Sequence, residues 1–167
     1  GNLAQAQATY AKVLAGASSE AITVAERAVD AARVTLDNAK ANLSAVTASQ
    51  NTAVANAYAA LLNTSFSAVV GSGNIDSVLP TISGTYIGTT EGFYRISLFN
   101  SGTGLKFSVS GLEIVSGEVK TYAVPMGSRG LFITFASTPA IDDTWTVSIP
   151  NTNASAYTTN NNAYLAA

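Results

Sequence analysis

The sequence predicts an α+β chain, in which a long antiparallel helical hairpin or coiled coil carries an all-β antiparallel sandwich. The composition changes near residue 65, since residues 3–62 contain no proline and one glycine, whereas all four prolines lie in 66–150. Apolar residues recur every three or four positions in the first part and alternate in the second. We therefore expect a helical hairpin over 1–65, an inserted β-sandwich over 66–150, and a linker with the start of a returning helix over 151–167.

The first part predicts a short helix over residues 3–15 and a long one over 19–62. Gly16 between them fits a helix end, because glycine adopts the left-handed backbone that closes many helices. Ser18 and Ser19 fit a helix N-cap, where a hydroxyl accepts a bond from an orphan amide. Glu20 then lies in the first turn, near the positive end of the helix dipole.

The long helix carries a seam of apolar residues with strict 3–4 spacing, which is the pattern of a heptad repeat. The seam consists of Ile22, Ala25, Val29, Ala32, Leu36, Ala39, Leu43 and Val46, and it continues through Gln50 to Ala53, Ala57 and Ala60. The alternating alanines allow a neighbouring helix to approach closely. A helix of about 1.5 Å per residue cannot bury this row by itself. We expect the first helix, the returning chain or another subunit to cover it.

The second part predicts short antiparallel strands bounded by turn residues, arranged as a sandwich or a small barrel. The expected strands cover residues 81–87, 93–100, 105–112, 118–124, 130–135 and 144–149. Most aromatic residues here are first needed as core rather than as the lining of a ligand groove. The expected core set is Phe93, Tyr94, Phe99, Phe107, Phe132, Phe135 and Trp145, whereas Tyr86 and Tyr122 are expected at the surface or rim.

The composition argues against an enzyme, a cofactor or a transition-metal site. The chain has no cysteine and no histidine, which removes the thiolate nucleophile, the usual general base and the commonest metal ligand. Its formal net charge of −2 leaves no basic face for nucleic acid.

Several loop residues nevertheless permit sharper hypotheses. Calcium ligands are available in Asp76, Glu91, Asp142 and Asp143, although adjacent aspartates are more often turn formers. An anion site at Ser128-Arg129-Gly130 is less expected than a hairpin turn, because no helix follows it. A weaker hydrolase alternative would need Lys12, Lys106 or Lys120 as a base, or a carboxylate pair among Glu91, Glu113, Glu118 and Asp142.

Two helical segments carry a resemblance to a known family. Residues 4–26 read AQAQATYAKVLAGASSEAITVAE, and residues 34–43 read VTLDNAKANL. This stretch resembles the helical region of the HlyD-like membrane fusion proteins, or periplasmic adaptor proteins. Residues 66–150 lie outside that family's hairpin pattern and are interpreted as an insertion between the outgoing and returning helices.

The resemblance implies a structural adaptor subunit of a membrane export or efflux complex. It implies protein contacts with a transporter and an outer component, homo-oligomerisation, and a place in the cell envelope, on the periplasmic or extracellular side of the cytoplasmic membrane. Because the chain opens in mid-helix sequence, we expect it to be a piece of a longer protein whose other regions anchor it to the membrane. The alternative is an extracellular adhesin or phage-fibre module with a coiled-coil stalk and a ligand-binding sandwich.

Overall fold

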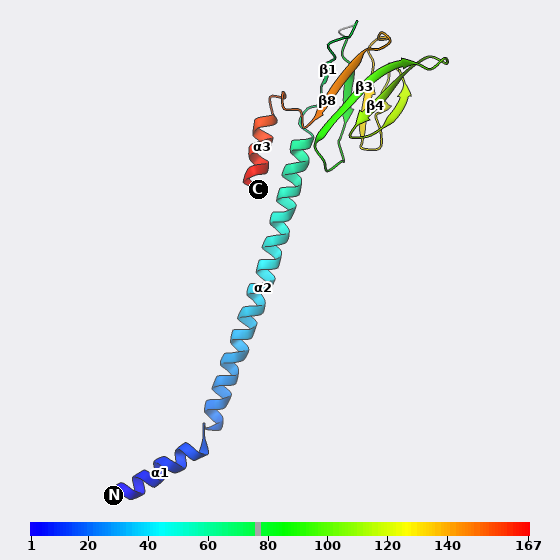
Figure 1. Ribbon diagram of the computed structural model, residues 1–167. Helices are drawn as coiled ribbons and strands as arrows, with labels where there is room; N and C mark the ends of the chain where they lie inside the picture. Colours follow the sequence, from blue (N-terminus) through cyan, green and yellow to red (C-terminus); the bar gives the residue numbers. More distant parts are fainter. Residues whose placement is uncertain (76–77) are drawn as a thin grey trace. The chain divides into compact units, whose positions relative to one another are not determined.

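The computed structural model describes residues 1–75 and 78–167 of the chain. They form two compact units, Gly1–Ser49 and Gln50–Ala167, which we treat separately. The predicted α+β class is confirmed, because long helices are combined with two antiparallel sheets (Figure 1). The helices are α1 (Asn2–Ala15), α2 (Ser19–Leu62) and α3 (Tyr157–Ala166). The strands are β1 (Ala68–Val70), β2 (Thr81–Gly84), β3 (Gly92–Asn100), β4 (Leu105–Gly111), β5 (Val115–Glu118), β6 (Val124–Pro125), β7 (Leu131–Thr134) and β8 (Thr144–Ile149).

The break between α1 and α2 follows the expected chemistry. Gly16 has φ of 72°, in the left-handed region, and its N–H donates to the carbonyl of Val13 at 3.3 Å. Ser18 then caps α2, since its hydroxyl accepts the N–H of Ala21 at 3.2 Å. Glu20 lies in the first turn of α2, as predicted.

Helix α2 ends where Thr64 satisfies its last carbonyl groups. The buried Thr64 hydroxyl donates to the carbonyl of Leu61 at 2.7 Å and to that of Ala60 at 3.3 Å. Ser65 follows with a positive φ of 25° and turns the chain away from the helix axis. The last carbonyl groups of α2 are thus satisfied by the chain itself rather than left without partners.

The β domain is made of two wholly antiparallel sheets. One has five strands in the order β1-β8-β3-β4-β5, and the other has three in the order β2-β7-β6. Central strand β3 pairs with β8 through Tyr94↔Val147 and with β4 through Ile96↔Val109. Alternate residues of each strand face inward, as their period predicts.

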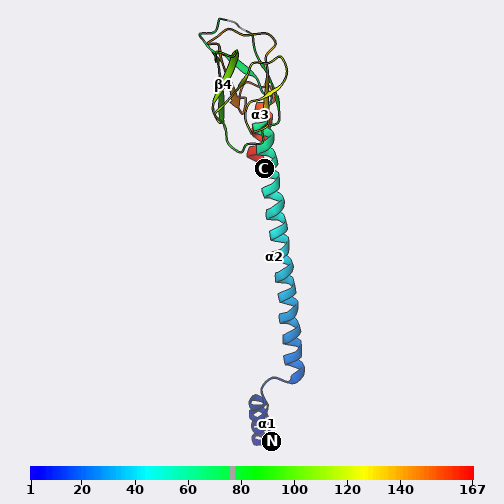
Figure 2. The same cartoon turned by 90° about the vertical axis from the view of Figure 1, so that its right-hand side faces the viewer.

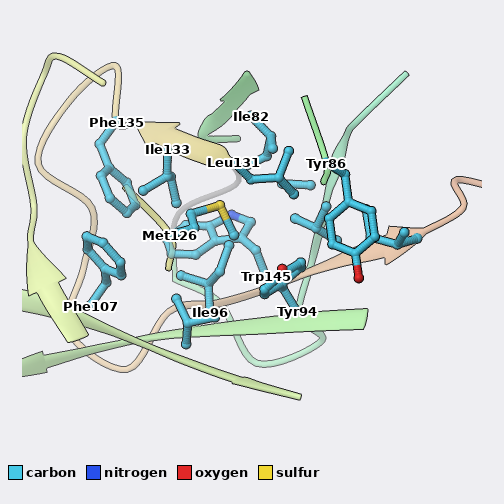
Figure 3. Packing of buried hydrophobic residues seen from close by; sticks show 14 of the residues in the cluster. Ile82, Tyr86, Tyr94, Ile96, Phe107, Met126, Leu131, Ile133, Phe135 and Trp145 are labelled. Atoms are coloured by element: carbon cyan, nitrogen blue, oxygen red, sulfur yellow. The ribbon is translucent and has the colours of Figure 1, made fainter. Parts of the chain in front are cut away.

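One hydrophobic core lies between the two sheets (Figure 3). Ile82 and Ile133 come from the three-stranded sheet, and Tyr94, Ile96 and Trp145 come from the five-stranded sheet. The ring of Phe135 lies between its neighbours, with its centroid 6.0 Å from that of Trp145 and 5.9 Å from that of Phe107. The Trp145 indole N–H donates to the carbonyl of Val78 at 3.1 Å, so its polar atom is satisfied.

The strand predictions need correction at four points. The predicted strand over residues 118–124 is wrong, because the chain leaves the larger sheet at Glu118 and enters the smaller one only at Val124. Strand β2 ends at Gly84 instead of residue 87, since φ of 101° there leaves the extended region. Strands β1 and β5 were missed, because only three residues of β1 pair with β8 and only four residues of β5 pair with β4.

The aromatic predictions are partly wrong. Tyr94, Phe107, Phe135 and Trp145 are buried as expected, whereas Phe93, Phe99 and Phe132 point outward from their strands and are exposed. Tyr86, expected at the rim, is buried with its ring edge-on to Tyr94 at 6.4 Å. Tyr122 is exposed, as predicted.

Candidate interaction surface

The predicted seam of α2 is an exposed apolar row in this chain. Leu36, at its middle, is 53% exposed, and every side chain of residues 1–49 is exposed. Helix α1, one of the three predicted covers, therefore does not bury the seam here. Burial of the seam by the returning chain or by another subunit stays a prediction. A row of large apolar side chains at heptad spacing is a candidate interaction surface.

Charges keep to one side of the helix between residues 21 and 49. Successive residues turn by about 100°, which places all six charged side chains within a sector of about 140°. These side chains are Glu26, Arg27, Asp30, Arg33, Asp37 and Lys40. Asp30 and Arg33 lie 3.7 Å apart and are exposed, so their pairing adds little stability. The seam and its other flank are free of charge, which suits contact with another helix.

Helix α3 packs beside the last turns of α2 and runs antiparallel to them (Figures 1 and 2). The side-chain amide of Asn160 donates to the Thr64 hydroxyl at 2.9 Å and to the carbonyl of Ala60 at 3.3 Å. Further along α3, the ring of Tyr164 lies 5.0 Å from that of Tyr58. Ala60 is a seam position, and Thr64 is the next one at the same spacing. Helix α3 thus lies on the continuation of the heptad seam.

The side chain of Asn63 joins the end of α2 to the β domain. Its amide NH₂ donates to the carbonyl of Tyr86 at 3.0 Å, and its oxygen accepts the N–H of Tyr86 at 2.7 Å. A single side chain thus satisfies both backbone groups of one residue, as a neighbouring strand would. Asn151, at the exit of β8, donates to the carbonyl of Ser65 at 2.8 Å and to the Ser67 hydroxyl at 2.9 Å.

A carboxylate network closes the end of the domain near the helices. Glu113 accepts hydrogen bonds from the N–H and hydroxyl of Ser128, both at 2.8 Å, and from the Tyr94 hydroxyl at 2.9 Å. Partial burial alone would raise the pKa of Glu113, but these hydrogen bonds outweigh it and hold the pKa below its usual value. Burial, together with the Glu113 carboxylate, raises the pKa of Tyr94.

The side chain of Arg129 is bonded to other residues of the β domain rather than left free for an anion. Its guanidinium donates to the Tyr86 hydroxyl at 2.9 Å and to the Thr90 hydroxyl at 3.0 Å, while the Tyr86 hydroxyl donates to the carbonyl of Thr90. Ser128 and Gly130 belong to the turn before β7, so the preferred interpretation of this segment as a turn is confirmed.

The calcium hypothesis gains no support from the described carboxylates. Asp143 is fully buried, and its carboxylate accepts the N–H of Ile75 at 2.8 Å and that of Ala140 at 3.3 Å. Asp142 has φ of 71°, as turn formers often do. Asp76 lies outside the described residues. Among the residues that the structure describes, no three carboxylates come together as metal ligands.

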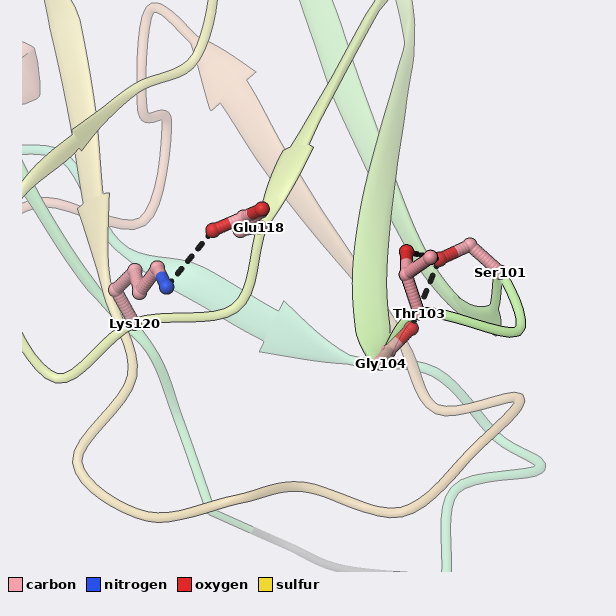
Figure 4. A network of polar contacts seen from close by, with 5 residues as sticks. All are labelled: Ser101, Thr103, Gly104, Glu118 and Lys120. Carbon is pink, nitrogen blue, oxygen red and sulfur yellow. Dashed lines mark hydrogen bonds and ion pairs between the residues drawn. The ribbon is translucent and has the colours of Figure 1, made fainter.

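The structure brings together three of the residues considered for catalysis, because Lys106 on β4 lies opposite Glu118 on β5 and Glu118 is paired with Lys120. Lys120 and Glu118 form an ion pair of 2.7 Å on the surface (Figure 4). The nearby turn after β3 is held by its own hydroxyl groups, since that of Ser101 lies 3.0 Å from that of Thr103. Glu118 has its pKa lowered by the hydrogen bond and the charge of Lys120. Glu113 serves the network around Ser128, and Lys12 lies in α1.

The residues that join the parts of the second unit were missed by sequence reasoning. Asn63, Asn151 and Asn160 occur in polar stretches, where an asparagine that serves a distant loop has the same sequence context as one in solvent. Their partners lie 84 to 100 residues away for Asn151 and Asn160. The only available signal was their position at the boundaries between the helical and β regions.

In comparisons with known proteins, no family model, no curated protein and no solved structure matches this chain. Among the described residues, no helix combines the length and the apolar character that crossing a membrane requires.

Proposed function

We propose that this chain is the helical hairpin region of an export-complex adaptor subunit, with a β domain inserted between its two arms. The observation that carries the proposal is the antiparallel docking of α3 on the seam positions at the end of α2. The chain enters the β domain from α2 and leaves it through α3, so the domain lies between paired helices. The resemblance of residues 4–26 and 34–43 to HlyD-like adaptors supports the same proposal.

In this proposal the seam from Ile22 to Val46 is covered by a helix that follows α3. Alanine at Ala25, Ala32 and Ala39 would allow that helix to approach closely. The subunit acts through protein–protein contacts in the cell envelope, forms homo-oligomers, and contacts a transporter and an outer component. The proposal assigns no catalytic residue, cofactor or metal to this chain, and it places the membrane anchor in other regions of the protein.

A second candidate function is an adhesin or phage-fibre module. It is favoured by the exposure of the seam from Ile22 to Val46, because a parallel bundle of identical helices would also cover a row with this spacing. The two proposals differ in what lies opposite Leu36. In the hairpin it is the subunit's own second arm, and in the fibre it is Leu36 of another copy.

Single cysteines distinguish these arrangements, because residues 1–167 contain no other cysteine. We expect Leu36→Cys in the full-length protein to be protected from maleimide and to form no disulfide with itself. Val34→Cys, on the charged side of the same helix, should react freely. Self-disulfides at position 36 would support the fibre. Free reaction at both positions in a monomeric protein would contradict both proposals.

The export assignment has its own test. Cross-linking of the full-length protein in its own cells, followed by mass spectrometry, should recover a transport ATPase or pump subunit in contact with it. If the protein is cross-linked only to copies of itself while Leu36→Cys stays protected from maleimide, the export assignment is rejected. The proposal of a helical hairpin would then still hold.

A further inference from the structure

The outer face of the five-stranded sheet carries an unpaired cation among hydroxyl groups. Residues of β3 that point outward are Phe93, Arg95, Ser97 and Phe99, because Tyr94, Ile96 and Leu98 point into the core. Within the part of the chain that the structure describes, the side chain of Arg95 has no hydrogen bond and no ion pair. Its guanidinium is therefore free to bind a ligand with two parallel hydrogen bonds.

The neighbours of Arg95 on this face are small alcohols. Directly opposite it lie Ser110 on β4 and Thr146 on β8. Together with the residues that flank these pairs, six hydroxyl side chains from three adjacent strands surround it: Ser97, Ser108, Ser110, Thr144, Thr146 and Ser148. The hydroxyls of Ser110, Thr146 and Ser148 have no hydrogen-bond partner among the described residues. They can both donate to a ligand and accept from it.

Two aromatic rings bound this polar surface. Phe93, two residues before Arg95, is 51% exposed, and Phe99 is 36% exposed. Six residues of extended strand place them about 20 Å apart along β3. Exposed rings on a rigid sheet offer apolar area with little ordering cost, and this is how binding faces commonly use aromatic residues.

The charges of the face favour an anionic ligand. Near Phe99, Lys106 lies opposite Glu118, and Glu118 is paired with Lys120 at 2.7 Å. With Arg95, the face therefore presents two cations, Arg95 and Lys106, and one carboxylate, Glu118, whose charge is already paired with Lys120. A ligand carboxylate would form an ion pair with the unpaired guanidinium of Arg95, whereas a cationic ligand would be repelled.

We propose that this face binds a carboxylate-bearing glycan, with Arg95 paired to a uronate-type carboxylate, Phe93 stacked on a sugar ring, and the hydroxyls bonded to ring substituents. A polyhydroxylated ligand matches a surface with this many free hydroxyls better than an acidic peptide does. The proposal depends only on the β domain, so it stands independently of how the helices pair.

Affinity electrophoresis of the whole chain in gels containing polygalacturonate tests the proposal. Wild-type protein should be retarded relative to a gel without polymer. Arg95→Gln should weaken binding about tenfold or more, as expected for loss of a charge-assisted bidentate pair. Arg27→Gln removes the same charge from an exposed position on α2 and should bind as wild type. Phe93→Ala should weaken binding, with Tyr10→Ala, an exposed ring on α1, as its control.

Two further polymers separate the alternatives. Fully methyl-esterified polygalacturonate keeps the sugars without the charge and should bind much more weakly. Polyglutamate keeps the charge without the sugars and should bind weakly too. The proposal is overturned if wild-type protein is not retarded, if Arg27→Gln loses as much binding as Arg95→Gln, or if polyglutamate binds as well as polygalacturonate.

Discussion

Asn63 is the residue on which the connection between α2 and the β domain most depends. It bonds both backbone groups of Tyr86, so Asn63→Ala would leave a partly buried N–H and carbonyl without partners. We expect a loss of about 1–3 kcal/mol in the free energy of unfolding. Urea denaturation followed by Trp145 fluorescence would measure it. Asn56→Ala, which changes an exposed asparagine in α2, serves as the control. Equal stability of the two variants would show that the Asn63 bonds are not formed.

The Glu113 network predicts a stability that falls in acid. The pKa of Glu113 is lowered in the folded protein, so its contribution is fully present above the unfolded pKa of about 4.3 and is lost as pH falls through the folded value. Glu113→Gln should cost about 1–3 kcal/mol at pH 7 and little below pH 3. Its unfolding free energy should therefore depend less on pH than that of the wild type, measured between pH 7 and 2.5.

The control for this prediction is Glu26→Gln, which changes an exposed carboxylate on α2. It should follow the wild-type pH profile. If Glu113→Gln and wild type differ by the same amount at every pH, then the ionised carboxylate is not what stabilises the turn at Ser128.

Residue chemistry could be predicted from sequence where the partner is local. Gly16 and Ser18 act within one helical turn, so their roles at the break follow from residue type alone. Tyr86 could not be placed in the same way. Its hydroxyl donates to the carbonyl of Thr90, four residues away, but it also accepts from Arg129, 43 residues away, which only the folded domain brings to it.

The seam of α2 yields a prediction for a whole element. Leu36 and Val34 are both exposed in this chain, at 53% and 60%, but only Leu36 lies on the heptad row. We expect Leu36→Asp to cost several kcal/mol in the assembled full-length protein, because it would place a charge in a buried interface. Val34→Asp should cost less than about 0.5 kcal/mol, as surface changes do. Thermal unfolding of both variants decides the matter, and equal melting temperatures would show that the seam is not buried.

The strands were predicted correctly where alternating apolar residues mark a face that is buried in the core. They were predicted wrongly where the boundary of a strand depends on which other strand it pairs with. Strands β3, β4, β7 and β8 alternate clearly and were placed within two residues at each end. Residues 118–124 alternate too, but there the chain crosses from one sheet to the other. The N–H of Phe135 donates to the carbonyl of Lys120 at 3.0 Å, so even the backbone bonds of this crossing are non-local. The position of Pro125 on an edge strand agrees with its missing N–H.

At the scale of the whole molecule, the two units differ in what stabilises them. The second unit has a core in which Trp145, Ile96 and Ile133 are fully buried, and it includes the end of α2 and helix α3. The first unit consists of helix with no buried side chain. Periodicity predicted both parts, yet it could not tell whether the seam finds a partner within the chain, because that depends on segments far away in sequence or on other subunits.

This difference predicts two separate thermal transitions. Trp145 is the only tryptophan and is fully buried, so its emission reports the core of the second unit. Helical circular dichroism at 222 nm reports mainly α1 and α2. An isolated helix is only marginally stable in water, whereas a packed domain unfolds cooperatively. In dilute solutions of this chain, the helical signal should therefore fall gradually and at lower temperature, before a sharp change in tryptophan emission.

Repeating the thermal unfolding at several protein concentrations then shows whether the chain is monomeric or associates with copies of itself. If the two signals are lost together and the shared midpoint rises with concentration, copies of the chain cover the seam, since association stabilises the folded state by mass action. A shared midpoint that does not depend on concentration would instead contradict the exposure of residues 1–49. A shortened chain beginning at Gln50 should keep the tryptophan transition in either case, because the core that it reports lies wholly within the second unit.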